Sequence, residues 1–314
     1  MTHRYTDQAL LIELEPTAAE LLNRHEKVAK EWHPHEYVPW SVGRDYPAFF
    51  DGGDDWTPDQ PRLTGVAQTA FQLNLLTEDN LPSYHREIHQ MFGAGDGAWI
   101  NWANRWTAEE DRHGTVLRDY LMVTRNIDPY ELERLRMKTL EAGYDRDDKD
   151  PLRGMAYVAF QELATRISHR NTGMYSQDPV ADRIMRRISA DENLHMIFYR
   201  DMLSAALELD PSSMVEAVTT EVMDFAMPGA VIEGFRRKAV EIANAGIYDL
   251  RIHHDEIVWP LLRHWGIFEL EGLDEAAEKS RQQLAHHMEG LDKSATRFEE
   301  KRAARRERDK AAVS

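Results

Sequence analysis

The feature that most constrains the fold of this chain is a set of carboxylates inside the apolar stripes of long predicted helices. One stripe advances in steps of three or four residues and consists of Trp99, Trp102, Trp106, Glu110, His113, Leu117 and Tyr120. A second stripe consists of Ile184, Ile188, Glu192, His195 and Tyr199. Side chains at this spacing share one helical face, and an apolar face is normally buried. Because an unpaired buried carboxylate is costly, each of these glutamates needs a partner or a metal ion.

Both stripes contain the motif Glu-x-x-His, once from Glu110 to His113 and once from Glu192 to His195. The i,i+3 spacing puts the two side chains of a motif on adjacent turns, about 5–6 Å apart, so that they can bind one metal ion together. Either motif alone is weak evidence, because a buried hydrogen-bond network of Glu, His and Arg without a metal is the better explanation of a single motif.

The order of the two motifs along the chain is more specific. Glu78 precedes Glu110 by 32 residues, and Glu162 precedes Glu192 by 30 residues, so a helix with one glutamate twice precedes a helix with Glu-x-x-His. This is the ligand set of ferritin-like di-metal carboxylate bundles. Four carboxylates neutralise two divalent cations, which permits burial of the cluster. Oxygen-rich ligation with one imidazole per ion suits iron or manganese better than zinc.

Apolar residues recur at helical spacing through nearly the whole chain of 314 residues. The pattern predicts an all-α fold, a four-helix bundle with additional helices packed around it. Helices are expected over 8–32, 64–92, 98–126, 129–143, 151–177, 179–208, 212–226, 230–246, 248–265 and 272–305. Thr64 and Asp178 are predicted N-caps, and Pro129 and Pro179 suit first-turn positions.

Three expectations concern the organisation of the chain. Residues 33–63 have no helical period and are rich in turn residues and aromatics, so an ordered loop around the body is predicted. Residues 1–270 are expected to form one ferritin-like domain. Residues 271–314 become strongly charged and are expected to form a C-terminal helix or tail that is partly disordered.

Composition excludes several classes of protein. The chain has no cysteine, which rules out disulfides, Cys-ligated zinc, iron–sulfur clusters and a thiol nucleophile. It carries 38 Lys+Arg against 55 Asp+Glu, a net charge of −17, so nucleic-acid binding is not expected. There is neither a signal-peptide pattern at the start nor an apolar run long enough for a transmembrane segment, and the expected location is cytoplasmic.

Four segments carry a family resemblance. They are TEDNLPSYHREI (77–88), WTAEEDRHG (106–114), FQELATRISHRNT (160–172) and ISADENLHMIFYRD (188–201). In this order and spacing they resemble the soluble acyl-carrier-protein desaturases, most strongly the mycobacterial-type actinobacterial branch and more distantly the plant stearoyl enzymes. The resemblance covers about residues 9–268.

The resemblance implies an O2-dependent di-iron enzyme that inserts a cis double bond into a saturated acyl chain on acyl carrier protein, in fatty acid biosynthesis. It implies two iron ions per chain, with manganese as a possible substitute, and two external electrons from a ferredoxin-type donor. It also implies a homodimer. The positions that match the family's iron ligands are Glu78, Glu110, His113, Glu162, Glu192 and His195. Which carboxylates bridge the irons is left open, with Glu110 and Glu162 or their equivalents as candidates.

The resemblance also assigns positions outside the ligand set. Thr165 matches a threonine that faces the O2 site, although a hydrogen bond to its own helix is an equal alternative. Trp32 and Asp191 match a tryptophan and an aspartate that link the surface to an iron-ligating histidine. Asp191 precedes a ligand and can accept a ligating His N–H. Glu109 could do the same in the other half, but a solvated glutamate is expected there.

Two other classes of function remain open. One is a different di-iron oxygenase, such as a hydroxylase or N-oxygenase of a carrier-bound substrate. The other is a non-catalytic protein, either an iron store or a metal-free module for acyl chains. Two further groups of residues are read as ordinary surface: the pairs His253–His254 and His286–His287, and a basic group of Arg236, Arg237 and Lys238 with Lys27 and Lys30, for which docking of an acidic carrier protein is the alternative.

Overall fold

The computed structural model describes residues 4–47, 52–92, 97–144 and 149–313. In these residues every regular element is a helix and no strand occurs, which confirms the all-α prediction. The bundle is built by α2 (Val66–Glu78) with α3 (Leu81–Phe92), α4 (Ala98–Val123), α6 (Pro151–Ser176) and α7 (Pro179–Leu209). No helix in the described part of the chain is both long and apolar enough to cross a bilayer.

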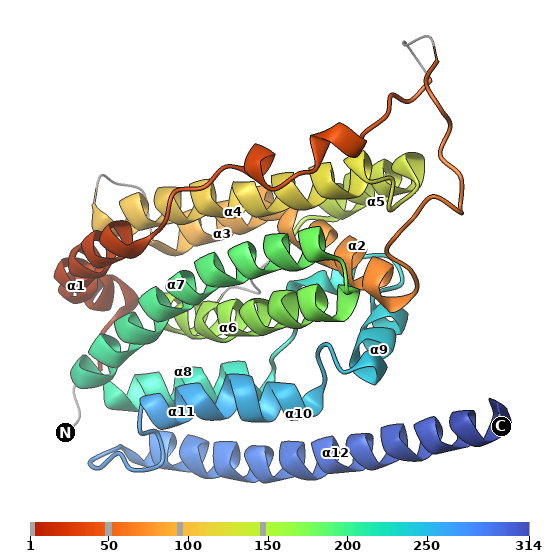
Figure 1. Ribbon diagram of the computed structural model, residues 1–314. Helices are drawn as coiled ribbons and strands as arrows, with labels where there is room; N and C mark the ends of the chain where they lie inside the picture. The colour runs from red at the N-terminus through yellow and green to blue at the C-terminus, as the bar shows by residue number, and fades with distance from the viewer. Residues whose placement is uncertain (1–3, 48–51, 93–96, 145–148, 314) are drawn as a thin grey trace.

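Further helices cover the bundle (Figure 1). α1 (Asp7–Val28) lies along α4 and α7, and α8 (Pro211–Met223) lies on α6. The remaining elements are α5 (Pro129–Ala142), α9 (Phe235–Ala245), α10 (Leu250–Ile252), a π-helical turn (His253–Val258), α11 (Trp259–His264) and α12 (Glu275–Val313). Short 3-10 turns occur at Pro34–Glu36, Trp40–Val42 and Pro228–Val231.

The prediction of one helix over 64–92 is wrong, because the segment is broken between Glu78 and Leu81. Pro82 is the reason: it has no N–H to donate to the carbonyl of Glu78, and its ring clashes with that carbonyl in a continuous helix. Within the break, the side chain of Asn80 donates to the carbonyl of Gly143 at 3.0 Å. The break leaves Glu78 as the last residue of α2, facing the interior.

The two predicted N-caps have different outcomes. Asp178 caps α7 as expected, accepting hydrogen bonds from the backbone N–H groups of Val180 and Ala181. Thr64 does not cap α2. The cap position is Gly65, whose φ of 55° suits glycine and leaves Thr64 outside the helix.

The described part of residues 33–63 lies against the end of α4. Arg125, just beyond that helix, donates to the backbone carbonyls of Asp45, Asp54 and Asp55. Trp56 donates in return to the carbonyl of Arg125 at 3.0 Å. These bonds replace the hydrogen bonds that a regular element would provide, as an ordered loop requires. Residues 48–51 of this segment lie outside the described residues.

The C-terminal region, expected as a charged helix or tail, is helical over most of its described residues. Residues 275–313 form the single helix α12, which packs mainly on α8. Ala277, Leu284 and Met288 on its inner face are buried in the main core. Charged residues dominate its composition, but these few apolar positions suffice to attach it. The domain division at residue 270 stays a prediction.

Candidate metal centre

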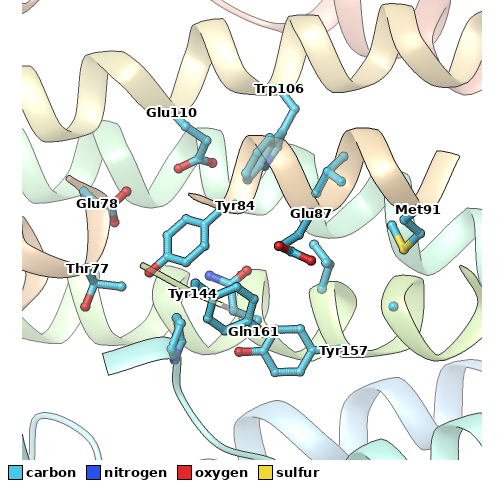
Figure 2. Close-up of a pocket in the computed structure, with 14 residues that line it drawn as sticks. Thr77, Glu78, Tyr84, Glu87, Met91, Trp106, Glu110, Tyr144, Tyr157 and Gln161 are labelled. Carbon is cyan, nitrogen blue, oxygen red and sulfur yellow. The ribbon is translucent and has the colours of Figure 1, made fainter. Parts of the chain in front are cut away.

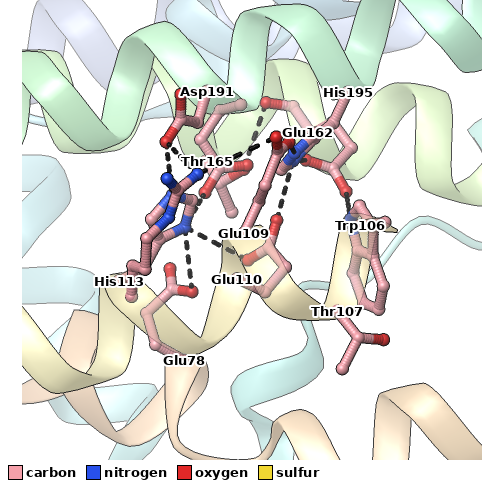
Figure 3. A network of polar contacts seen from close by, with 12 residues as sticks. Glu78, Trp106, Thr107, Glu109, Glu110, His113, Glu162, Thr165, Asp191 and His195 are labelled. Carbon is pink, nitrogen blue, oxygen red and sulfur yellow. Dashed lines mark hydrogen bonds and ion pairs between the residues drawn. The ribbon is translucent and has the colours of Figure 1, made fainter. Parts of the chain in front are cut away.

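The six predicted metal ligands converge inside the bundle, and none is more than 8% exposed. They are Glu78 at the end of α2, Glu110 and His113 on α4, Glu162 on α6, and Glu192 and His195 on α7. Figure 3 shows five of them pointing toward one another, namely Glu78, Glu110, His113, Glu162 and His195. The helical stripes that carry them are otherwise apolar, so the charged groups are held in a core that excludes water.

The ligand atoms form two groups of four, and within each group all atoms lie within 4.8 Å of one another. The first group consists of Glu78, Glu110, His113 and Glu192. The second consists of Glu110, Glu162, Glu192 and His195. Glu110 and Glu192 belong to both groups, so these two carboxylates are placed to bridge two ions, whereas Glu162 belongs to one group only.

The two histidines are oriented alike. Nδ1 of His113 lies 3.2 Å from Glu110 Oε2, and Nδ1 of His195 lies 2.8 Å from Glu110 Oε1. In both rings Nε2 points away from the cluster toward a further carboxylate. A ligating histidine usually donates its other ring N–H to such an acceptor, which fixes its tautomer.

Asp191 is the further carboxylate for His113. Its Oδ2 lies 3.5 Å from His113 Nε2 and accepts a 2.7 Å hydrogen bond from the indole N–H of Trp32. Arg187, one turn earlier on α7, donates to the other oxygen. Asp191 is thus adjacent to Glu192 in sequence, yet it serves the histidine of the opposite helix. These contacts link Trp32, Asp191 and His113 in the order that the resemblance implies.

Glu109 is the further carboxylate for His195, and the expectation that it is solvated is wrong. It is 3% exposed, and its Oε2 lies 2.9 Å from His195 Nε2 and 2.8 Å from Nε2 of His25 on α1. Arg105, one turn earlier, lies 2.5 Å from the other oxygen. The sequence contained a signal for this residue: Arg-x-x-x-Glu-Glu before His113 corresponds to Arg-x-x-x-Asp-Glu before His195.

Thr165 lies between the cluster and the backbone of its own helix. Its hydroxyl lies 2.8 Å from Glu192 Oε2, to which it can donate, and 3.1 Å from the carbonyls of both Gln161 and Glu162 on its own helix. Its single hydroxyl proton can go to Glu192 or to one of these carbonyls, so the residue contacts both a shared carboxylate and its own helix.

Two residues that the sequence did not single out for the site hold the remaining carboxylates. Nε2 of His169 lies 2.9 Å from Glu78 Oε1. The indole N–H of Trp106 donates to Glu162 Oε1 at 3.0 Å. His169 is seven residues after Glu162, two turns along α6. Only the approach of α2 to α6 gives it a partner, so its spacing alone was not informative.

The electrostatics of the cluster show a need for positive charge. Burial and the negative charges of Glu110 and Glu162 raise the pKa of Glu192 well above its usual value. Burial opposes protonation of His195, but the nearby carboxylates of Glu109 and Glu110 outweigh it and raise its pKa well above the usual value. Glu78 responds in the opposite direction, because its bonds to the two histidines His113 and His169 overcome burial and lower its pKa to about 2.

The donor set fits a pair of metal ions. Glu110 Oε1, Glu162 Oε2 and His195 Nδ1 are buried and have no hydrogen-bond partner of good geometry. These three atoms nevertheless lie close together, with His195 Nδ1 at 2.8 Å and 3.5 Å from the two oxygens. Buried polar atoms that converge without bonding to one another are expected where a cation completes their coordination.

A pocket of ≈ 70 Å³ adjoins one side of the cluster. Figure 2 shows Glu78 and Glu110 at one end and Met91 at the other, with tyrosine rings between them. Its lining is mainly apolar or aromatic and includes Trp106, Ile88, Met91, Tyr157 and Val158. The absence of a side chain at Gly154 lets Met91 line the pocket, since a Cβ there would lie 2.1 Å from Met91 Sδ. A slender apolar chain is the ligand that such a lining favours.

Comparison with known proteins identifies the family. The sequence model of the fatty acid desaturases matches residues 6–314. The chain belongs to this fatty acid desaturase family. The match includes α12, which lies beyond the range of 9–268 that the four segments suggested.

Individual desaturases agree with this assignment. DesA1 of Mycobacterium tuberculosis, provisionally named an acyl-[acyl-carrier-protein] desaturase, is 52% identical over 307 residues, which is 95% of this chain and 90% of that protein. A chloroplastic stearoyl-[acyl-carrier-protein] 9-desaturase of Arabidopsis thaliana is 32% identical over 225 residues, 67% of this chain and 58% of that protein. Enzymes of these names are oxidoreductases.

A solved structure supports the same fold. The X-ray structure of DesA2 from Mycobacterium tuberculosis, also provisionally named an acyl-ACP desaturase, superposes with a TM-score of 0.70 at 28% sequence identity. The alignment covers 87% of this desaturase and 99% of DesA2. The predicted ferritin-like all-α bundle is thereby confirmed.

The other sequence features have simpler outcomes. The alternative of one basic docking group is not supported, because Lys238 is buried and donates to Gln72 at 2.8 Å, and α9 and the end of α1 lie at opposite sides of the molecule (Figure 1). His254 is buried rather than on the surface, beside Asp255 in the π-helical turn. Neither it nor His253 belongs to any candidate metal group among the described residues.

Proposed function

We propose that this desaturase inserts a cis double bond into a saturated acyl chain carried on acyl carrier protein, using O2 and two iron ions. Glu78, Glu110, His113, Glu162, Glu192 and His195 are the proposed ligands. The observation that carries the proposal is the pair of four-residue groups sharing Glu110 and Glu192, with an apolar pocket beside them. Manganese can occupy the same oxygen-rich donor set.

The proposed reaction balances with an external reductant. Two adjacent methylene groups each lose one hydrogen, O2 takes up these two hydrogens with two electrons and two protons, and two water molecules form. The electrons must come from a separate redox protein, for which a ferredoxin-type donor is proposed. The chain has no cysteine and so no Cys-ligated cluster in which to store them. Bound iron supplies the oxidising chemistry, because acids and bases alone do not activate such C–H bonds.

The residues of the chain position and protect this chemistry. The pocket lining orients the acyl chain past Glu110 and Trp106 and excludes water. Asp191 and Glu109 hold the Nε2 protons of His113 and His195, so that both Nδ1 atoms stay available as ligands. Thr165 orients the carboxylate of Glu192 through its hydroxyl.

The relatives named for carrier-bound substrates motivate acyl carrier protein as the partner. Such carriers and ferredoxins are generally acidic, and the chain itself has a net charge of −17. Docking therefore depends on local basic groups, whose attraction extends over about 10 Å at 0.1 M salt. We also propose that the enzyme is a homodimer, as the resemblance implies.

A two-part experiment tests the function. Iron per chain is measured first, after anaerobic loading with Fe(II). The loaded protein then receives O2, reduced ferredoxin and saturated acyl carrier proteins of several chain lengths, and products are identified by mass spectrometry. Loss of two hydrogens supports desaturation. Gain of oxygen supports the hydroxylase or N-oxygenase alternative instead, and two bound irons without any product would contradict both.

A further inference from the structure

Both outer carboxylates of the candidate metal centre are anchored by the same short stretch of chain. Trp32, just beyond the end of α1, donates to Asp191, and His25, in the last turn of α1, contacts Glu109. α1 itself provides none of the proposed metal ligands. His25 connects this helix to the His195 half of the cluster through Glu109.

We propose that His25 is a positioning residue that orients the ligand His195 through Glu109. This inference rests on the proposed metal centre, which it deepens. Glu109 Oε2 lies between two imidazole nitrogens, 2.8 Å from His25 Nε2 and 2.9 Å from His195 Nε2. With His25 donating from one side, the carboxylate oxygen is fixed where it accepts the Nε2 proton of His195. The lone pair of His195 then stays on Nδ1, which faces the cluster.

The surroundings of His25 explain why the ring holds its place. It is 4% exposed and continues the buried stripe of Leu14, Ala18 and Leu21 on α1. Its ring packs edge-on against Trp102, at a centroid distance of 5.1 Å, and lies stacked 5.8 Å from the ring of His195. These contacts leave the imidazole little freedom to turn away from Glu109.

The chemistry of the site argues against simple filling of space. The other ring nitrogen of His25, Nδ1, is buried without a hydrogen-bond partner. A leucine or methionine would fill this largely apolar position without leaving a polar atom unsatisfied. The contact with Glu109 explains why a histidine occupies this position, because Glu109 is the carboxylate that orients His195.

The two chains of contacts that lead outward from the ligand histidines, one through Asp191 and one through Glu109, end in different hydrogen-bond donors. On the Asp191 side the last donor is an indole N–H, and on the Glu109 side it is an imidazole N–H. Removal of one donor should therefore affect one metal position and leave the other unchanged. Loss of such an outer partner typically weakens metal binding about 10–100-fold.

Anaerobic titration of the full-length protein with Fe(II), and with Co(II) as a spectroscopic probe, tests the inference without any assay of turnover. In His25→Leu, one of the two ions should bind about 10–100-fold more weakly, and the visible spectrum of Co(II) should change for that ion only. His25→Gln keeps an N–H at a similar reach and should restore the wild-type titration. Leu21→Ala, one turn earlier on the same buried face, serves as the matched packing control and should bind both ions as the wild type does.

Three results would overturn the proposal: wild-type titration by His25→Leu, no rescue by His25→Gln, or an equal loss in Leu21→Ala. If His25→Leu does not fold, His25→Asn replaces it, because its shorter amide withdraws the donor from Glu109 and the same loss is expected. If the wild-type protein bound no metal at all, the proposed function would fail as well. Two ions in the wild type with an unaltered His25→Leu would contradict the role of His25 alone.

Discussion

The two halves of the candidate metal centre have the same types of proposed ligand, but different residues hold those ligands in place. In one half, His113 is backed by Asp191 and Trp32, whereas in the other His195 is backed by Glu109 and His25. The residues that contact the two unshared glutamates, Glu78 and Glu162, also differ in type between the halves. A histidine, His169, contacts Glu78, and a tryptophan, Trp106, donates to Glu162.

The difference teaches that the repeat in the sequence extends from the proposed ligands to the outer carboxylates and one arginine each, and no further. Each outer carboxylate keeps its arginine four residues earlier, Arg187 for Asp191 and Arg105 for Glu109. Beyond these groups the partners differ: His25, in the last turn of α1, contacts Glu109, and Trp32, just beyond that helix, donates to Asp191. The two halves, which have the same types of proposed ligand, therefore differ chemically in their surroundings.

The largest expected effect comes from removing a shared ligand. Glu110→Ala should prevent binding of both ions and reduce turnover by at least about 1000-fold, or about 4 kcal/mol of transition-state stabilisation. Glu162→Ala belongs to one group and should retain one ion while it also abolishes turnover. Iron analysis and circular dichroism distinguish these cases from unfolding. Equal iron content in the two variants would contradict the division into shared and unshared ligands.

The outer carboxylates provide the next comparison. Asp191→Asn and Glu109→Gln should each weaken the binding of one ion about 10–100-fold, because each replaces the charged carboxylate acceptor of one histidine with a neutral amide that has a single acceptor oxygen. The affected ion should differ between the variants, as measured by Fe(II) titration with Mössbauer spectroscopy of the bound iron. Loss of the same ion in both variants would show that the halves are not independent.

Metal loading should change how stability depends on pH. The pKa values of His113 and His195 are raised by their carboxylate partners despite burial, and that of Glu192 is raised by burial and neighbouring charge. Groups with raised pKa values stabilise the fold fully below their unfolded pKa values, about 6.5 for His and 4.3 for Glu, and lose this contribution as pH rises through the folded values.

The metal-free protein should therefore lose unfolding free energy as pH rises above neutrality. Ions replace the bound protons, so the loaded protein should lose less over the same range, and loading at 100 times the dissociation constant adds about 2.7 kcal/mol per site. Chemical denaturation at several pH values, with and without metal, measures both effects. Glu110→Ala is the control and should show no gain on adding metal.

The smallest expected effect concerns Thr165, which donates to Glu192 and has no counterpart on Glu110, whose Oε1 lacks a partner. Thr165→Val is nearly isosteric and removes the donor, with an expected cost of about 1 kcal/mol in unfolding free energy and a modest loss of turnover. Thr165→Ser keeps the hydroxyl and should behave as the wild type in both assays. A serine variant as impaired as the valine variant would mean that the methyl group matters rather than the bond.

Much of the site was predictable because it lies along single helices. Glu110 with His113, and Glu192 with His195, are fixed relative to each other by the i,i+3 geometry of the α-helix. The stripe pattern also showed that these groups are buried. Glu109 could have been found from the sequence, because Arg105 precedes it by four residues just as Arg187 precedes Asp191. Its position one residue outside the apolar stripe suggested a solvent-exposed side chain instead.

What the sequence by itself determined is therefore the all-α class, the helices that bear ligands and the ligand residues that we propose. Local periodicity specifies these features, because each depends on contacts within one or two turns. The tertiary structure alone decided that Asp191 serves the histidine of the opposite helix, that Glu110 and Glu192 are shared, and that His25, His169 and Trp106 complete the surroundings. These contacts join residues 56 to 91 positions apart, as for Trp106 with Glu162 and Glu78 with His169, and only the packing of helices brings such residues together.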